Sequence, residues 1–508
     1  GFMKALLSVY NKKEIELMGS SLSEAGYEII STGGTYNSLN KAGVPVQQIS
    51  DFTGSPEILN GRVKTLHPKV HGGILARRDI PDHLEELESY GISEIDVVVA
   101  NLYPFVDTVR KEDVSLSEAL ENIDIGGPTM IRAAAKNFPD VLVVVDPSDY
   151  GWVAEKISCG QGFTKDERKK LAQKAFQHVA LYDTAISTWL SEAPLESAEL
   201  SIGLSKVTDL RYGENPHQDA VLYRDTLGEG GIVQAEQLHG LPMSYTNYLD
   251  ADAAWTTVTS FNKTACVVVK HTNPCGISVD DDQPSAYEGA FQGDSISAYG
   301  GIVGFNTVVT KKTAEVMRGV LFDIIVAPDY EVDALDILRK RKRTRILKAN
   351  HHSGPFSNLE ALTITGGMLI QTSDQIQEDP STWKVVTDRY PTETESSDLE
   401  FAWSCLRHIK SNTIVLAKNN TLVGMGAGQP NRLVSVHLAL RIAEDRSIGS
   451  SLASDAFMPF ADNVELAARG GITAIIQPGG SIRDEEVIEA ANHHSLAMMF
   501  TGIRHFNH

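Results

Sequence analysis

The sequence predicts an α/β protein of about three domains, since its 508 residues correspond to three units of about 150 residues each. The runs over residues 96–100 and 141–145, apolar at every position except Asp96, are typical of strands buried on both faces of a parallel sheet. Stretches with helical spacing separate such runs. This alternation indicates helices layered on a sheet.

The first third of the chain contains the clearest elements. The apolar run 5–9 predicts a first strand, and the spacing over 13–25 predicts a helix. A second strand is expected over 27–30 and one long helix over 165–190. Residues 191–205 are small and polar without periodicity, so we expect them to connect two domains.

A second α/β pattern follows this connection, with strands expected over 266–269, 301–305 and 322–326. A faint internal repeat links this region to the C-terminal part of the chain. It pairs residues 267–270 with 414–418, 300–302 with 470–472, and 324–328 with 474–478. Repeats indicate related units, so we expect two subdomains with a boundary near residue 372.

The charge balance excludes several classes of function. Lys and Arg number 45 and Asp and Glu 66, which gives a net charge of −21 and a poor match for nucleic-acid phosphates. The basic run 339–345 is interpreted as a solvated helix end, with nucleic-acid contact as the alternative. The sequence contains no apolar run of about 18 residues, the length that would predict a membrane-spanning helix. Four scattered cysteines fit a reducing cytoplasm.

Searches for cofactor motifs are negative. The sequence has no phosphate loop of the G-x-x-x-x-G-K-[ST] type, and Gly424–Gly428 lacks the spacing of a dinucleotide site. Pro274-Cys275 resembles half of a zinc deaminase signature, but neither a second Cys at the required offset nor an H-x-E partner is present. We therefore expect no zinc and no nicotinamide or flavin.

Polar, glycine-rich clusters follow several predicted strands of the N-terminal region. The residues from Ser31 to Thr35 lie between a strand and a helix, where free backbone N–H groups can hold an anion. In the segment from Gly61 to Pro68, Arg62 and Lys64 lie two residues apart and face the same way if the backbone is extended. Similar clusters cover 101–105, 123–128 and 135–137. Because open α/β sheets bind ligands at the carboxyl ends of their strands, the clusters predict a site for a phosphorylated ligand.

These clusters, together with several downstream motifs, resemble the bifunctional purine biosynthesis family. That family joins 5-aminoimidazole-4-carboxamide ribonucleotide (AICAR) formyltransferase to inosine monophosphate (IMP) cyclohydrolase. The downstream motifs are Leu210–Gln218, Lys270–Gly276, Gly426–Gln429 and Ser454–Phe460, in the family's order. The resemblance covers nearly the whole chain.

The resemblance implies a fold and a domain division. It implies a methylglyoxal-synthase-like parallel-sheet domain over residues 3–195, the cyclohydrolase. Two cytidine-deaminase-like α/β subdomains without zinc are implied over 196–372 and 373–508, and together they form the formyltransferase.

The resemblance also implies transfer of a formyl group from 10-formyltetrahydrofolate to the 5-amino group of AICAR. His271 matches the family's general base, and imidazole suits proton transfer near neutral pH. Lys270 would stabilise charge on the formyl oxygen or protonate the leaving group, and Asn412 would lie beside the reacting centre. The matching substrate-binding positions are Arg211, Tyr212, Asn247, Asp323, Arg432 and Arg504 for the nucleotide region and Phe457, Pro459 and Asp462 for the folate side.

The second implied reaction closes the formylated product, FAICAR, to IMP with loss of water. Lys64, Tyr103, Asp124 and Lys136 match the family's polar residues for this step, and the proton donor among them stays open. The matching ligand-binding positions are Lys12, Thr32, Gly33, Gly34, Thr35, Arg62, Thr65, Asn101, Gly126 and Gly127.

The resemblance further implies a homodimer and a structural potassium ion with no ligands assigned. The expected partners are small molecules only, without nucleic acid or membrane. Two other functions are open to the sequence: a regulatory nucleotide-binding protein and a nucleobase deaminase. The Lys270-His271 pair with Asn412 argues against the first, and the missing metal signature argues against the second.

Overall fold

The computed structural model describes residues 2–111 and 113–508 and divides them into two compact units. The N-terminal unit runs to Leu204 and also contains Asp225–Leu227. The C-terminal unit holds Ser205–Arg224 and Gly228–His508. The boundary at Leu204 lies inside the segment expected to connect two domains.

The N-terminal unit is built on a five-stranded sheet in the order β3-β2-β1-β4-β5, and every pairing in it is parallel. Its strands are β1 (Lys4–Val9), β2 (Glu28–Ser31), β3 (Gln47–Gln48), β4 (Val97–Asn101) and β5 (Leu142–Val144). The strand order reverses between β1 and β4, so their carboxyl ends flank the crevice where such sheets bind ligands.

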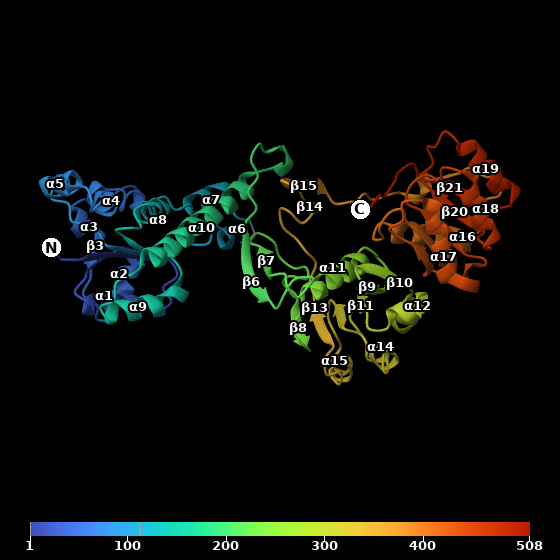
Figure 1. The fold of residues 1–508 in the computed structure, drawn as a ribbon, viewed down its shortest axis with the longest axis horizontal. Helices are drawn as coiled ribbons and strands as arrows, with labels where there is room; N and C mark the ends of the chain where they lie inside the picture. Colours follow the sequence, from blue (N-terminus) through green and yellow to red (C-terminus); the bar gives the residue numbers. More distant parts are fainter. Residues whose placement is uncertain (1, 112) are drawn as a thin grey trace. The chain divides into compact units, whose positions relative to one another are not determined.

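Helices cover both faces of this sheet, which explains the unbroken apolar runs. Leu7 and Val99 face one core with α1 (Ile15–Glu24), α2 (Gly33–Lys41) and α9 (Tyr150–Ser158). Leu6 and Val98 face the other core with α4 (Pro68–Leu75), α8 (Gly126–Lys136) and α10 (Lys165–Leu190). These elements run from dark blue to teal in Figure 1. The predicted long helix is confirmed as α10, which begins with a capping box formed by Thr164 and Glu167.

The shorter elements of this unit are α3 (Ile49–Thr53), η1 (Leu59–Gly61), α5 (Pro81–Ser89), α6 (Phe105–Val109), α7 (Leu116–Glu121), η2 (Pro147–Asp149) and η3 (Pro194–Glu196).

The C-terminal unit contains a twelve-stranded mixed sheet in the order β16-β21-β20-β19-β17-β18-β10-β9-β11-β12-β13-β8. Its first half comprises β8 (Glu236–His239), α11 (Tyr245–Thr259), β9 (Ala265–Lys270), β10 (Asn273–Val279), α12 (Gln283–Gly293), α13 (Ser295–Ala298), β11 (Ile302–Phe305), α14 (Lys311–Val316), β12 (Ile324–Ala327), α15 (Val332–Leu338) and β13 (Arg345–Lys348). Its second half comprises η4 (Pro380–Thr382), β16 (Lys384–Val385), α16 (Glu393–Leu406), β17 (Ile414–Lys418), β18 (Thr421–Gly426), α17 (Arg432–Ala443), η5 (Glu444–Ser447), β19 (Ser451–Ser454), α18 (Ala461–Arg469), β20 (Ala474–Gln477), α19 (Asp484–His493) and β21 (Ala497–Phe500).

The two halves repeat one topology. In each, a helix leads into an antiparallel hairpin (β9–β10 or β17–β18), followed by an antiparallel neighbour and two parallel strands. A short antiparallel strand, β8 or β16, closes each outer edge. The halves meet where β10 pairs with β18 at Ser278 and Thr421.

This topology corrects part of the internal repeat read from the sequence. The predicted equivalence of β9 with β17 and of β12 with β20 is confirmed, because the two members of each couple occupy equivalent places in the two halves of the sheet. The pairing of residues 300–302 with 470–472 is wrong, because Gly300 precedes β11, whose counterpart is β19, whereas Gly470 precedes β20. The true counterpart of Gly300 is Gly449, which also has positive φ and precedes β19.

Two further hairpins of the chain, β6 (Leu204–Leu210) with β7 (Ala220–Asp225) and β14 (Leu359–Ile364) with β15 (Gly367–Thr372), form separate two-stranded sheets. Both carry exposed apolar side chains, including Leu362 and Leu369 on the second hairpin.

The basic run follows the end of α15, but it is solvated only in part, because Arg341 and Arg345 are half-buried. Arg341 donates to two backbone carbonyls, and Arg345 Nε donates to the Pro242 carbonyl at 3.0 Å. Among the described residues, no helix is long and apolar enough to cross a membrane.

Candidate active sites

In the N-terminal unit, the loop after β1 is fixed by side chains from two neighbouring segments. Asn101 Oδ1, at the end of β4, accepts from the backbone N–H groups of Tyr10 and Asn11, both at 2.8 Å. Thr35 Oγ1 accepts from Val9 N and donates to Val9 O, both at 3.0 Å. Thr35 and Asn101 are buried and occupied by these bonds. They therefore hold the loop that carries Lys12.

Two lysines lie beside the first turn of α2. A Cβ atom placed on Gly34 would lie 2.9 Å from Lys12 Cε, and one placed on Gly33 would lie 3.8 Å from Lys64 Nζ. The preceding residue, Thr32, makes no side-chain cap and instead contacts the hydroxyl of Ser8 at 2.6 Å. Free N–H groups at a helix N-terminus together with two ammonium groups form a site suited to a phosphate. The glycines leave space for the ligand to approach the backbone.

A second helix N-terminus, that of α8, packs against predicted site residues. Asp124 Oδ1 accepts from Gly127 N at 3.0 Å, and a Cβ on Gly127 would come within 2.4 Å of Asp124 Oδ2. A Cβ on Gly126 would come within 2.3 Å of Thr65 Oγ1. Side chains at these two glycines would displace Thr65 and Asp124, so both positions require glycine.

Helix α10 supports the loops that carry Tyr103 and Asp124. His178 Nε2 accepts from Leu102 N at 3.1 Å, and burial lowers the pKa of His178, which favours the neutral imidazole needed to accept. The Tyr182 hydroxyl accepts from Asp124 N at 2.8 Å. Tyr103 itself packs edge-on against Tyr10, with ring centroids 4.3 Å apart.

Two predicted residues have other surroundings. Arg62 forms an exposed ion pair with Glu121. Lys136 is the last residue of α8, so the length of this 11-residue helix, about 15 Å, separates it from Asp124. Lys136 instead lines a shallow depression of about 660 Å³ with Phe138 and Phe176. The N-terminal unit therefore does not bring Lys136 to the cluster of Lys12, Lys64 and Asp124.

In the C-terminal unit, His271 lies at the tip of the β9–β10 hairpin. The turn consists of His271 and Thr272, both with positive φ (53° and 64°), between the paired residues Lys270 and Asn273. The preceding Lys270 donates from Nζ to the Tyr299 carbonyl at 3.1 Å. Asp250 Oδ1, from α11, accepts from Thr272 N at 2.7 Å. A β-branched residue with positive φ is rare, so other contacts must hold this turn.

Electrostatics group three residues around this turn. Burial raises the pKa of Asp250, whereas the hydrogen bond from Thr272 and the nearby His271 lower it, and Asp323 raises it further. The hydrogen bond from Thr272 thus places the Asp250 carboxylate beside the turn that carries His271.

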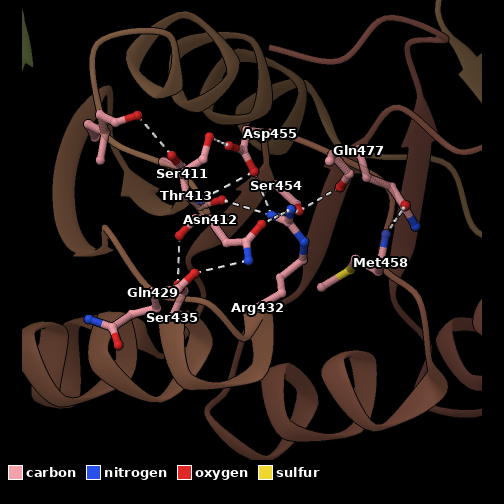
Figure 2. Close-up of polar contacts among 12 residues, drawn as sticks. Ser411, Asn412, Thr413, Gln429, Arg432, Ser435, Ser454, Asp455, Met458 and Gln477 are labelled. Atoms are coloured by element: carbon pink, nitrogen blue, oxygen red, sulfur yellow. Dashed lines mark hydrogen bonds and ion pairs between the residues drawn. The ribbon is translucent and has the colours of Figure 1, made fainter. Parts of the chain in front are cut away.

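Asn412 lies in a second polar cluster, shown in Figure 2, at the start of β17. Its side-chain nitrogen donates to the carbonyls of Gln429 and Pro430, both at 3.0 Å. Its Oδ1 accepts from Arg432 Nη2 at 2.6 Å, and its carbonyl accepts from Ser435 Oγ at 2.6 Å. Every polar group of the Asn412 side chain is thus oriented by the protein.

Arg432 is buried and bonded to groups of its own chain. Its Nη1 donates to Asp455 Oδ1 at 2.5 Å and to Ser454 Oγ at 3.0 Å. Asp455 also accepts from Thr413 N at 3.2 Å and from the Ser411 hydroxyl. The sequence predicted a nucleotide contact for Arg432, whereas the structure shows it joining Asn412 to a buried carboxylate.

The other predicted formyltransferase residues have separate contacts. Asn247 forms a capping box with Ser244 at the start of α11. Arg211 lies over the Tyr212 ring at 5.8 Å, and Arg504 lies over the Phe506 ring at 4.4 Å. Phe457 and Pro459 lie in the loop between β19 and α18, where Phe457 is exposed, and Asp462 lies in the first turn of α18. Among the described residues, no hydrogen bond or ion pair joins Lys270 or His271 to Asn412.

The cysteine of the partial deaminase motif, Cys275, is poorly suited to bind a metal ion. Cys275 is buried, donates to the Val268 carbonyl at 3.4 Å, and burial raises the pKa of its thiol to about 12. A cysteine binds zinc as its thiolate. Within residues 2–111 and 113–508, no group of three or more His, Cys, Asp or Glu side chains could hold a metal ion.

Sequence reasoning missed Asp250, His178, Tyr182 and Asp455. Only Asp455 lies within a motif that the sequence analysis singled out. The others are polar residues of helices, and their roles depend on contacts with distant segments that no local pattern reports.

Two protein families match successive parts of the chain. The MGS-like domain family matches residues 15–129, and the AICARFT/IMPCHase bienzyme family matches residues 134–442. The chain is 50% identical to the bifunctional purine biosynthesis protein purH of Dictyostelium discoideum, with 100% of each chain covered. It is also 50% identical to the PurH protein of Thermoanaerobacter sp. (strain X514), with 99% of each chain covered.

A solved structure, the "Crystal structure of ForH", is 38% identical and covers 37% of this chain and 98% of its own, with a TM-score of 0.33. The two full-length relatives and the bienzyme match, which spans more than half of the chain, are sufficient to assign the family. The chain belongs to the AICARFT/IMPCHase bienzyme family, the bifunctional AICAR formyltransferases and IMP cyclohydrolases of purine biosynthesis.

Proposed function

We propose that the N-terminal unit closes FAICAR to IMP and that the C-terminal unit formylates AICAR. The observation that carries the first assignment is the pair of ammonium groups, Lys12 and Lys64, beside the first turn of α2. Lys12 and the free N–H groups of this turn suit the phosphate of a ribonucleotide, which leaves the Lys64 ammonium for the reacting groups. The site lies at the carboxyl ends of β1 and β2, where a parallel sheet presents its ligand.

Ring closure in this proposal is an intramolecular condensation. The carboxamide nitrogen attacks the formyl carbon, a C–N bond forms, and the formyl oxygen takes up a proton. The attacking nitrogen gives up one proton as this carbinol forms. A second N–H proton is then lost while the hydroxyl takes up another proton, the C–O bond breaks, a C=N double bond forms and water leaves. Because both reacting groups are on one molecule, holding them in contact lowers the barrier.

Three side chains are assigned to this chemistry. Lys64 stabilises the developing oxyanion, while Tyr103 and Asp124 are placed by α10 to exchange protons with the substrate. Thr35 and Asn101 hold the surrounding backbone, and Thr32 contacts the Ser8 hydroxyl. Thr65, Gly126 and Gly127 shape the edge at α8. The position of Lys136 leaves it outside the chemistry of a single chain.

Formyl transfer is assigned to the hairpin tip and the Asn412 cluster. His271 accepts the proton of the AICAR amine while that nitrogen bonds to the formyl carbon. Lys270 stabilises the formyl oxygen and then protonates the departing tetrahydrofolate nitrogen as the old C–N bond breaks. Asn412 orients the reactants. The formyl donor in this proposal is 10-formyltetrahydrofolate.

The repeated topology of the C-terminal unit supports two subdomains of cytidine-deaminase type, divided near residue 372, which is also the end of β15. The first domain is proposed to end at residue 195, nine residues before the compact unit does. A cytoplasmic location fits the four free cysteines. The structural potassium ion implied by the family is retained in the proposal without assigned ligands.

A homodimer is part of the proposal, because the β14–β15 hairpin exposes Leu362, Met368 and Leu369 by 62%, 48% and 57%. A two-stranded hairpin is marginally stable alone. A second copy of the chain can cover this apolar surface. Lys270-His271 and Asn412 could then complete a formyltransferase site from two chains.

The function is tested by mixing the full-length protein with AICAR and 10-formyltetrahydrofolate. Tetrahydrofolate should appear first and IMP should follow. Absence of tetrahydrofolate release would contradict the formyltransferase assignment. Release without IMP would contradict the cyclohydrolase assignment.

A further inference from the structure

The internal repeat places two aspartates in equivalent positions behind the two central hairpins. In α11, the capping residue Ser244 is followed six residues later by Asp250 and eleven residues later by Trp255. In α16, Thr392 is followed at the same intervals by Asp398 and Trp403. Each aspartate accepts hydrogen bonds from the backbone at the tip of its own half's hairpin.

The two aspartates are used differently. Asp398 binds with both oxygens, accepting from Asn419 N at 3.2 Å and from Asn420 N at 2.8 Å. Asp250 binds with one oxygen, Oδ1, to Thr272 N at 2.7 Å. Among the described residues, no hydrogen bond reaches its other oxygen. Asp398 is thus a purely structural anchor, whereas half of the Asp250 carboxylate stays available.

The two hairpin tips also differ in chemistry. Asn419 and Asn420 adopt positive φ, which asparagine tolerates well. His271 and Thr272 adopt the same backbone, and Thr272 is β-branched, a residue type that does so rarely. The first half therefore keeps an unfavourable turn in order to present an imidazole, and unfavourable backbone of this kind is concentrated at functional sites.

The hydrogen bond of Asp250 ends on Thr272, the residue next to His271, so the carboxylate lies close to the His271 backbone. The imidazole is close enough to lower the pKa of the Asp250 carboxyl, against the rise caused by burial and by Asp323. When a histidine takes a proton in a reaction, a neighbouring carboxylate stabilises the imidazolium that forms.

We propose that Asp250 is a positioning residue for formyl transfer. One oxygen holds the turn so that His271 projects from the hairpin tip, and the negative charge of the carboxylate stabilises protonated His271 after it takes the amine proton of AICAR. This inference rests on the proposed role of His271 as the base. It assigns Asp250 no contact with substrate.

The decisive variant is Asp250→Asn, because asparagine keeps an oxygen to accept from Thr272 N and removes only the charge. Asp398→Asn is the matched control at the equivalent position of the other half. The readouts are kcat and KM for AICAR in formyl transfer, together with the melting temperature of the purified full-length protein.

We expect Asp250→Asn to lower kcat by about 10- to 1,000-fold, as for other groups that stabilise transition-state charge. The KM for AICAR and the melting temperature should stay close to wild type. Asp398→Asn should lower the melting temperature, since it loses one of two backbone anchors, and leave kcat within about twofold.

Two outcomes overturn the proposal. A wild-type kcat in Asp250→Asn would show that the charge has no role. If Asp250→Asn and Asp398→Asn both lower kcat and both lower the melting temperature to a similar extent, the role of Asp250 is structural only. His271→Ala separates this from the proposed function. If His271→Ala keeps kcat, the base assignment itself is wrong; if it loses kcat while Asp250→Asn does not, only the role of Asp250 fails.

Discussion

Asp455→Ala removes the carboxylate at the centre of the Asn412 cluster. The Asp455 side chain is fully buried, and that of Arg432 is 7% exposed. The substitution leaves the Arg432 guanidinium without its counter-charge. It also removes the acceptor of the Thr413 N–H group and of the Ser411 hydroxyl.

Removing one partner of a buried ion pair costs about 3–5 kcal/mol, because the remaining charge stays buried. We therefore expect the free energy of unfolding of the C-terminal unit to fall by about that amount. Arg432 also orients Asn412 through a 2.6 Å hydrogen bond, so formyl transfer should fall with it. The N-terminal unit shares none of these contacts, and conversion of FAICAR to IMP should stay near wild type.

The assay is urea unfolding of the full-length protein, with both activities measured in parallel without denaturant. A double variant, Arg432→Met with Asp455→Leu, removes both charges and should recover most of the lost stability but not formyl transfer. A loss below about 1 kcal/mol, the range of solvent-exposed pairs, would refute the reasoning. So would an equal loss of both activities.

Three further predictions concern other parts of the molecule. Burial raises the pKa of Glu395, but hydrogen bonds from Arg389 and Thr392 outweigh this and bring it to about 2, below its ordinary value of 4.5. This stabilisation is present above pH 4.5 and is lost as the pH falls towards 2. Between these pH values the melting temperature of Glu395→Gln should therefore fall less steeply than that of the wild type; equal dependence of the two melting temperatures on pH would contradict the assignment. Dialysis against a strong chelator should leave both activities intact, and activity restored by zinc would revive the deaminase interpretation. Mixing inactive His271→Ala and Asn412→Ala chains should restore part of the formyl transfer, because some mixed sites carry neither lesion; subunit exchange without regained activity would show that each chain builds its own site.

The sequence was informative where burial acts locally. A strand with helices on both faces must be apolar at every position, and the runs at 96–100 and 141–145 therefore marked β4 and β5. The contribution of Lys12 and the first turn of α2 to this cluster was also predictable, because both follow strands of one parallel sheet. Lys64 lies beyond α3 and η1, so its place beside them depends on tertiary structure.

The sequence was uninformative where a role depends on tertiary contacts. Nothing near Asp250 in the chain indicates that it holds a turn more than 20 residues away, at Thr272. The long helix around Tyr182 likewise gives no sign that its hydroxyl supports Asp124. Arg432 could be recognised as a site residue, but its burial against Asp455 could not be foreseen.

In this enzyme two separate sites are proposed to perform the two reactions. The most direct test of this proposal follows tetrahydrofolate and IMP in one reaction of AICAR and 10-formyltetrahydrofolate catalysed by Lys64→Ala. Tetrahydrofolate release should continue near the wild-type rate while IMP formation falls by about 100- to 10,000-fold and FAICAR accumulates. If both products fall together in a folded protein, or if IMP keeps pace with tetrahydrofolate, the two-site account is wrong.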